Sequence, residues 1–125
     1  MNEINVLING AEGSPYEGGN FNGIIPLSGY HSTPPNVQFA TRIDHHNVSN
    51  NGYLCLDILT PEKWKSTFDI KFIILSMIHL MAHPNGFDYL NEEAAQLFMK
   101  DIDAFDKARE VTSQFATDHV PNENQ

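Results

Sequence analysis

Basic side chains are scarce in this sequence. Lys and Arg number 7 against 16 Asp and Glu, which leaves a formal net charge of −9 with the histidines neutral. The first basic residue along the chain is Arg42. Because binding to phosphate backbones needs clustered Lys and Arg, we expect no nucleic-acid partner. An acidic chain of this kind is better suited to a basic surface on another protein.

The sequence also lacks a second cysteine and a long apolar run. Cys55 is the only cysteine, so an internal disulfide is excluded and the thiol is either inert and buried or reactive. The longest apolar stretch, Phe72 to Met81, is interrupted by Ser76 and His79. It is too short and too polar for a membrane span, and the N-terminus does not have the pattern of a signal peptide. We therefore expect a cytoplasmic or nuclear protein that does not enter a membrane.

The first third of the chain predicts an antiparallel meander of short strands. β-branched and apolar residues separated by Gly, Pro and Asn turns occupy three segments: Ile4–Ile8, Phe21–Leu27 and Val37–Ala40. Gly23 and Pro26 weaken the second strand, since proline cannot donate a ladder hydrogen bond. Residues 42–66 are expected to be mostly irregular, as is typical of a functional loop.

The second half predicts helices. Phe72, Ile73, Leu75, Ile78 and Met81, with Met77 between them, fit a buried helix that Asp69 caps. A short helix is expected over 92–99 after Asn91, and a last helix carries Phe105, Ala108, Arg109, Thr112 and Phe115 at three- and four-residue steps. Strands followed by a long loop and then helices predict one α+β domain, with the meander packed on the C-terminal helices.

The surroundings of Cys55 favour a nucleophile over an inert core thiol. Asn47 lies eight residues earlier, and the Asn51-Gly52 turn between them can fold this asparagine back over the thiol. A zinc site built from Asp44, His45, His46 and Cys55 is the rival interpretation. Adjacent histidines in an extended segment point to opposite sides and no second cysteine completes the ligands, so we expect no metal and no cofactor.

A set of motifs in fixed order resembles the ubiquitin-conjugating enzymes. The motifs are Tyr16-Glu17-Gly18-Gly19-x-Phe21, Pro34-Pro35-x-Val37-x-Phe39, His45-His46-Asn47, Asn51-Gly52-x-Leu54-Cys55-Leu56-Asp57-Ile58-Leu59, Trp64, Pro84-Asn85, Leu90-Asn91-x-Glu93-Ala94-Ala95 and Ala108-Arg109-Glu110-x-Thr112. The resemblance implies that residues 1–116 form a ubiquitin-conjugating (UBC) core domain and that 117–125 form a polar tail.

The resemblance implies a role for each candidate site residue. Cys55 would accept ubiquitin from an activating enzyme as a thioester, and a substrate lysine would then attack it. Asn47 would donate a hydrogen bond to the developing oxyanion or hold the loop, and Asp88 would orient or deprotonate the lysine. His45 would hold the loop, and the groove for the ubiquitin tail would be shaped by Asp57 and Leu90. Structural alternatives remain for several: a turn asparagine at 47, a solvated aspartate at 88, packing at 90 and a surface charge at 57.

The sequence departs from the family where partners are expected to bind. It has no counterpart of the helix and first strand with which members usually begin, so the fold is expected to be N-terminally truncated. The two loops expected to face a RING or HECT-type ligase are polar and read Tyr30-His31-Ser32-Thr33 and Trp64-Lys65-Ser66-Thr67. His46 replaces the usual proline, which loosens the loop that carries Asn47. The alternative function is therefore an inactive module that binds ubiquitin or an enzyme of the pathway.

Overall fold

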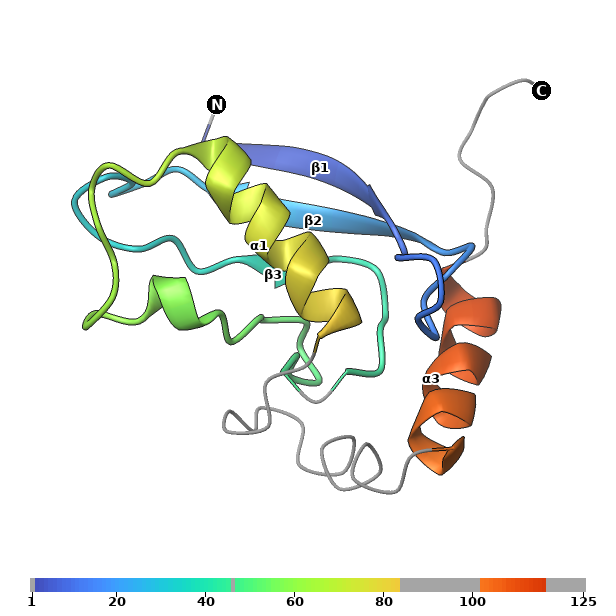
Figure 1. The fold of residues 1–125 in the computed structure, drawn as a ribbon. Helices are drawn as coiled ribbons and strands as arrows, with labels where there is room; N and C mark the ends of the chain where they lie inside the picture. Colours follow the sequence, from blue (N-terminus) through green and yellow to red (C-terminus); the bar gives the residue numbers. More distant parts are fainter. Residues whose placement is uncertain (1, 46, 84–101, 117–125) are drawn as a thin grey trace.

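The structure is a computed structural model that describes residues 2–45, 47–83 and 102–116 (Figure 1). Its elements, in chain order, are the strands β1 (Glu3–Asn9), β2 (Asn20–Pro26) and β3 (Gln38–Phe39), the 3-10 helix η1 (Asp57–Leu59), and the helices α1 (Ile70–Ala82) and α3 (Ile102–Phe115). No helix within these ranges is long and apolar enough to cross a membrane. The described part of the chain is thus a mixed α+β structure.

The three strands form an antiparallel sheet in the order β1-β2-β3, which confirms the predicted meander. β2 pairs over its full length with β1, from Glu3 opposite Pro26 to Asn9 opposite Asn20. Pro26 is the last residue of its strand, a position where a missing N–H donor disrupts little of the ladder. Among the described residues β1 forms one edge of the sheet.

The third strand, Gln38–Phe39, is shorter than the predicted Val37–Ala40, and its backbone is also bonded to the loop that precedes Cys55. The amide of Leu54 donates to Val37 O at 3.1 Å, and the amide of Phe39 donates to Gly52 O at 2.8 Å. A segment expected to be a plain strand is therefore shared between the sheet and the Cys55 loop.

Helix α1 lies across the sheet (Figure 1) and begins where the sequence predicts. The Asp69 carboxylate accepts a hydrogen bond from the Phe72 amide at 2.8 Å, which satisfies one of the free N–H groups of the first turn. Met77 reaches the sheet at Gly23, where a Cβ atom would stand 2.8 Å from the methionine methyl group. Gly23 therefore gives the helix room to approach the sheet.

The prediction that the whole apolar set of α1 is core was wrong for two residues. Ile73, Met77 and Met81 are buried, whereas Phe72 and Leu75 keep 39% and 52% of their surface exposed. The helix is apolar nearly all round, but only one face of a helix packs on the sheet. The remaining apolar side chains line a surface cavity described below.

Helix α3 docks at the turn between β1 and β2 (Figure 1). The Ala116 carbonyl accepts from the Asn20 amide at 2.8 Å, and the Arg109 guanidinium donates to the Pro15 and Glu17 carbonyls. Ala108 and Thr112 are fully buried. The predicted helix is confirmed, and its small residues make the close contact.

The aromatic residues of α3 do not share that buried face. Phe105 and Phe115, which recur at the same steps as Ala108 and Thr112, are exposed. At Gly19 an added Cβ would stand 2.8 Å from the Thr112 methyl group, so this contact has no space for a large ring. The helix therefore packs by its small residues.

Several predicted features lie outside the described residues. They are His46, the short helix over 92–99, the tail 117–125, and the two site residues Asp88 and Leu90. These stay predictions, as does the boundary of the domain at 116.

Candidate active site

The Asn51-Gly52 turn brings Asn47 and Cys55 together through the backbone. The Ser49 amide donates to Tyr53 O at 2.9 Å, and Val48 and Leu54 form an antiparallel β-bridge. The Cys55 amide donates to Asn47 O at 2.8 Å. Such a tight reversal needs Gly52, which has a positive φ of 92°. An added Cβ there would stand 2.2 Å from Phe39 O.

Cys55 is half-buried between two buried leucines. Leu54 and Leu56 are buried on either side, whereas Cys55 has intermediate exposure. Asn47 is fully buried. The backbone bond thus places a half-buried cysteine next to an asparagine that is withdrawn from water.

His45 ties the loop to helix α1. Its Nε2 donates to the Leu80 carbonyl at 2.7 Å, and its Nδ1 accepts from the Asn47 amide at 3.0 Å. The ring is fully buried. One nitrogen donates and the other accepts, so both are engaged and the pattern is that of a neutral imidazole.

Tyr16 packs on His45, and the sequence predicted no role for it. Its ring stacks on the His45 ring with centroids 5.7 Å apart, and its hydroxyl donates to Asp44 O at 2.6 Å. Burial, followed by the nearby Asp44 carboxylate, raises the pKa of the Tyr16 phenol well above its usual range. The only signal in the sequence was its place in the Tyr16-Glu17-Gly18-Gly19 motif.

Asp57 begins η1 two residues after Cys55. Its Oδ2 lies 2.7 Å from Lys63 Nζ, and both side chains are more than half exposed. A solvated ion pair of this kind adds little stability. Asp57 also lines the cavity described next, so the geometry fits both the groove residue and the surface charge that the sequence left open.

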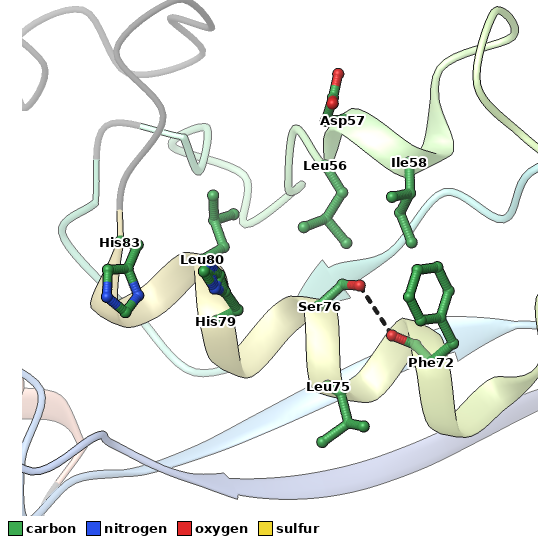
Figure 2. Close-up of a pocket in the computed structure, with 9 residues that line it drawn as sticks. All are labelled: Leu56, Asp57, Ile58, Phe72, Leu75, Ser76, His79, Leu80 and His83. Carbon is green, nitrogen blue, oxygen red and sulfur yellow. Dashed lines mark hydrogen bonds between the residues drawn. The ribbon is translucent and has the colours of Figure 1, made fainter.

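An apolar cavity of about 480 Å³ lies between η1 and α1, and its lining includes the three residues that follow Cys55 in the chain. Figure 2 shows Leu56 and Ile58 facing helix α1 from above, with Phe72 below Ile58. Leu75, His79 and His83 also line it. The exposed apolar residues of α1 thus belong to this cavity, whose only sequence signal is a helix that is apolar nearly all round.

The two loops expected to face a ligase are bonded to each other. The indole N–H of Trp64 donates to His31 O at 3.1 Å, and His31 Nδ1 donates to Ser66 O at 2.9 Å. The Tyr30 ring contacts both the His31 ring and the Trp64 ring, with centroid distances of 4.0 and 6.0 Å. The loops therefore form one surface that mixes polar groups with aromatic rings.

Of the six predicted site residues, the structure brings His45, Asn47 and Cys55 together and places Asp57 at the adjoining helix. Within the described ranges, no three His, Cys, Asp or Glu side chains are grouped so as to hold a metal ion.

Comparison with known proteins gives a consistent picture. The family model described as "Ubiquitin-conjugating enzyme" matches residues 1–112. The chain is 37% identical over 114 residues to Ubiquitin-conjugating enzyme E2 S-B of Xenopus laevis, covering 90% of this chain and 54% of that protein. It is 38% identical over 116 residues to Probable ubiquitin-conjugating enzyme E2 31 of Arabidopsis thaliana, covering 91% and 75%. The chain thus spans about half the length of E2 S-B.

Proposed function

This chain belongs to the ubiquitin-conjugating enzyme family, and from that premise we propose that Cys55 carries ubiquitin as a thioester and, with a ligase, passes it to substrate lysines. The observation that supports the proposal is the backbone bond from the Cys55 amide to Asn47 O, which holds a half-buried cysteine beside a buried asparagine. A reduced thiol is required, so the proposed location is the cytoplasm or the nucleus.

The proposed reaction has two acyl transfers. The Cys55 thiolate attacks the carbonyl carbon of ubiquitin bound to the activating enzyme, and that enzyme's thiolate leaves. A lysine amine then attacks the new thioester, loses a proton, and expels the Cys55 thiolate. Each attack places negative charge on the carbonyl oxygen, which a fixed hydrogen-bond donor stabilises.

The residues around Cys55 divide this work in the proposal. The side-chain amide of Asn47 donates to the oxyanion, and Asp88 orients the lysine or accepts its proton. His45 has both ring nitrogens in structural hydrogen bonds, so its part is to hold Asn47 in place. The apolar cavity between η1 and α1, together with Asp57 and Leu90, receives the C-terminal tail of ubiquitin that leads to the thioester.

A charging assay tests the proposal. The chain is incubated with activating enzyme, ATP and ubiquitin, and a covalent adduct that a reducing agent cleaves is expected. Cys55→Ser serves as the matched control, since an oxygen ester survives reduction and no thiol-sensitive adduct forms. If the wild-type chain gives no adduct while an established member of the family is charged in parallel, the proposed activity is wrong.

The second candidate is a module that binds ubiquitin or a pathway enzyme without being charged. It is favoured by the ligase-facing loops, because the Trp64 indole N–H is occupied by a bond to His31 O and the His31 ring by a bond to Ser66 O. Saturable binding of ubiquitin without any adduct supports this candidate, whereas a Cys55-dependent adduct excludes it.

A further inference from the structure

A second cavity, of about 590 Å³, lies between the Asn51-Gly52 turn, the segment after β3 and helix α3. Unlike the cavity of Figure 2, it has a mostly polar lining, which includes Thr41, Arg42, Asp44, Asn50, Asn51 and Lys107. Cys55, Asn47 and His45 are not among its lining residues. The proposed thioester chemistry therefore leaves this cavity unexplained.

Arg42 presents hydrogen-bond donors that nothing in the described chain uses. Its guanidinium carbon stands 4.9 Å from the centre of the Phe115 ring. Within residues 2–45, 47–83 and 102–116 the guanidinium makes no hydrogen bond and no ion pair, although the sequence holds 16 carboxylates. A ring contact leaves the in-plane N–H groups available, and their fork geometry matches an oxyanion.

The charge of the lining also favours an anion. Among the described lining residues Arg42 and Lys107 are cations and Asp44 is a carboxylate, so these residues carry 2 − 1 = +1, while the whole chain carries −9. The side-chain amides of Asn50 and Asn51 make no hydrogen bond within the described ranges and add neutral donors. At these residues an anion would meet cationic and amide donors with a single opposing carboxylate.

We propose that this cavity binds an oxyanion group, a phosphate or a carboxylate, carried by the protein that accepts ubiquitin. Gly52, at the wall of the cavity, is three residues before Cys55, so a ligand held there lies on the loop of the thiol. The identity of the carrier rests on the proposed function, whereas the oxyanion site itself does not. Arg42 is the main donor.

The test is direct binding to the full chain without ubiquitin. Calorimetry compares three otherwise identical glycine-rich peptides whose central residue is phosphoserine, glutamate or serine. The two anionic peptides are expected to bind saturably, inorganic phosphate is expected to displace both, and the serine peptide is expected not to bind. The tighter of the two anionic peptides identifies phosphate or carboxylate as the preferred group.

Variants locate the site. Arg42→Gln removes a charge-assisted donor and is expected to weaken binding roughly tenfold or more. Lys71→Gln makes the same charge change on α1, outside the cavity lining, and is expected to keep the affinity within about twofold. Thermal unfolding of each variant checks the fold, and Lys107→Gln replaces Arg42→Gln if that variant does not fold.

Three results overturn the oxyanion site: neither anionic peptide binds, the serine peptide binds as well as they do, or Lys71→Gln and Arg42→Gln weaken binding equally. These readouts need no thioester, so a failed charging assay does not affect them. If the oxyanion site is shown and Cys55 is charged, a transfer assay tests the carrier. Faster transfer to a lysine peptide that contains phosphoserine or glutamate than to the serine peptide, lost in Arg42→Gln, identifies the acceptor of ubiquitin as the carrier of the oxyanion. An equal rate with the serine peptide refutes the acceptor as carrier.

Discussion

Cys55 takes its position from backbone contacts that extend inward to a buried histidine. The Cys55 amide is bonded to the Asn47 carbonyl, and the Asn47 amide is bonded to the His45 ring. Neither contact uses the Asn47 side chain, so a substitution there removes the proposed oxyanion donor and leaves both bonds possible.

Asn47→Ala is therefore expected to slow discharge of the Cys55 thioester to free lysine by roughly a hundredfold, the effect of losing one oxyanion donor. Single-turnover discharge measures this rate, and chemical unfolding measures stability. A variant that loses stability but discharges within about twofold of wild type assigns Asn47 to the loop instead of the oxyanion.

Tyr16 is expected to make the protein less stable at high pH. Its folded pKa is raised by burial above its unfolded value of about 10, so its contribution is complete below that pH and falls as pH rises toward the folded pKa. Above pH ~10 the unfolded state has lost the proton that the folded state keeps, which lowers the free energy of unfolding by about 1.4 kcal/mol per pH unit.

Tyr16→Phe removes this ionisation. Urea unfolding between pH ~9 and ~11 is expected to give the variant a slope that is shallower by about one proton, although the variant is less stable at neutral pH because the bond to Asp44 O is lost. Equal slopes for the two proteins contradict the assignment.

For single residues, the sequence was informative where a reaction or a turn requires one residue type. The interval from Asn47 to Cys55 and the intervening turn predicted their proximity, which the backbone bond bears out. The support from Tyr16 and the bond from His45 to Leu80 O join residues 29 and 35 positions apart in the chain, and no local pattern records such contacts.

Among the elements, the Asn51-Gly52 turn has little tolerance for change. Gly52→Ala meets both a positive φ and a clash with Phe39 O, and we expect a loss of about 3 kcal/mol or more in the free energy of unfolding. Gly13→Ala is the matched control, because Gly13 has a φ of 85° but nothing within 4 Å of an added Cβ. It is expected to cost only about 1 kcal/mol.

Chemical unfolding of both variants separates backbone strain from close contact. If the two substitutions cost the same, the approach of Gly52 to Phe39 is not what fixes the turn.

The elements differ in how well the sequence predicted them. Strands β1 and β2 and helix α1 with its Asp69 cap follow from local pattern and capping chemistry, and they are confirmed. The exposure of Phe72, Leu75 and Phe115 was not predicted, because periodicity shows which residues are apolar but not how wide a face the neighbouring element covers. The bonds between β3 and the loop before Cys55 were not predicted either.

For the molecule as a whole, Arg109 joins the C-terminal helix to the first hairpin. Its guanidinium donates to the Pro15 and Glu17 carbonyls, more than ninety positions earlier in the chain. Arg109→Met keeps much of the aliphatic stem but removes both bonds.

We expect Arg109→Met to lower the free energy of unfolding by about 2 kcal/mol and to speed hydrogen exchange in α3 more than in α1. Lys71→Met is the control, since Lys71 is exposed and its loss is expected to cost less than about 0.5 kcal/mol. Equal acceleration in both helices means that α3 and the sheet open as one unit.

The bond from His45 to the Leu80 carbonyl has a kinetic consequence. Leu80 is in the last turn of α1, where carbonyls have no partner within the helix, so a histidine from the Asn47 loop acts as part of the helix cap. In its native geometry this bond needs the last turn of α1 to be in place. We therefore expect the loop around Cys55 to order late in folding. In local unfolding we expect it to open before the last turn of α1 or together with it. In native-state hydrogen exchange, the Asn47 and Cys55 amides would then be protected no longer than the final amides of α1.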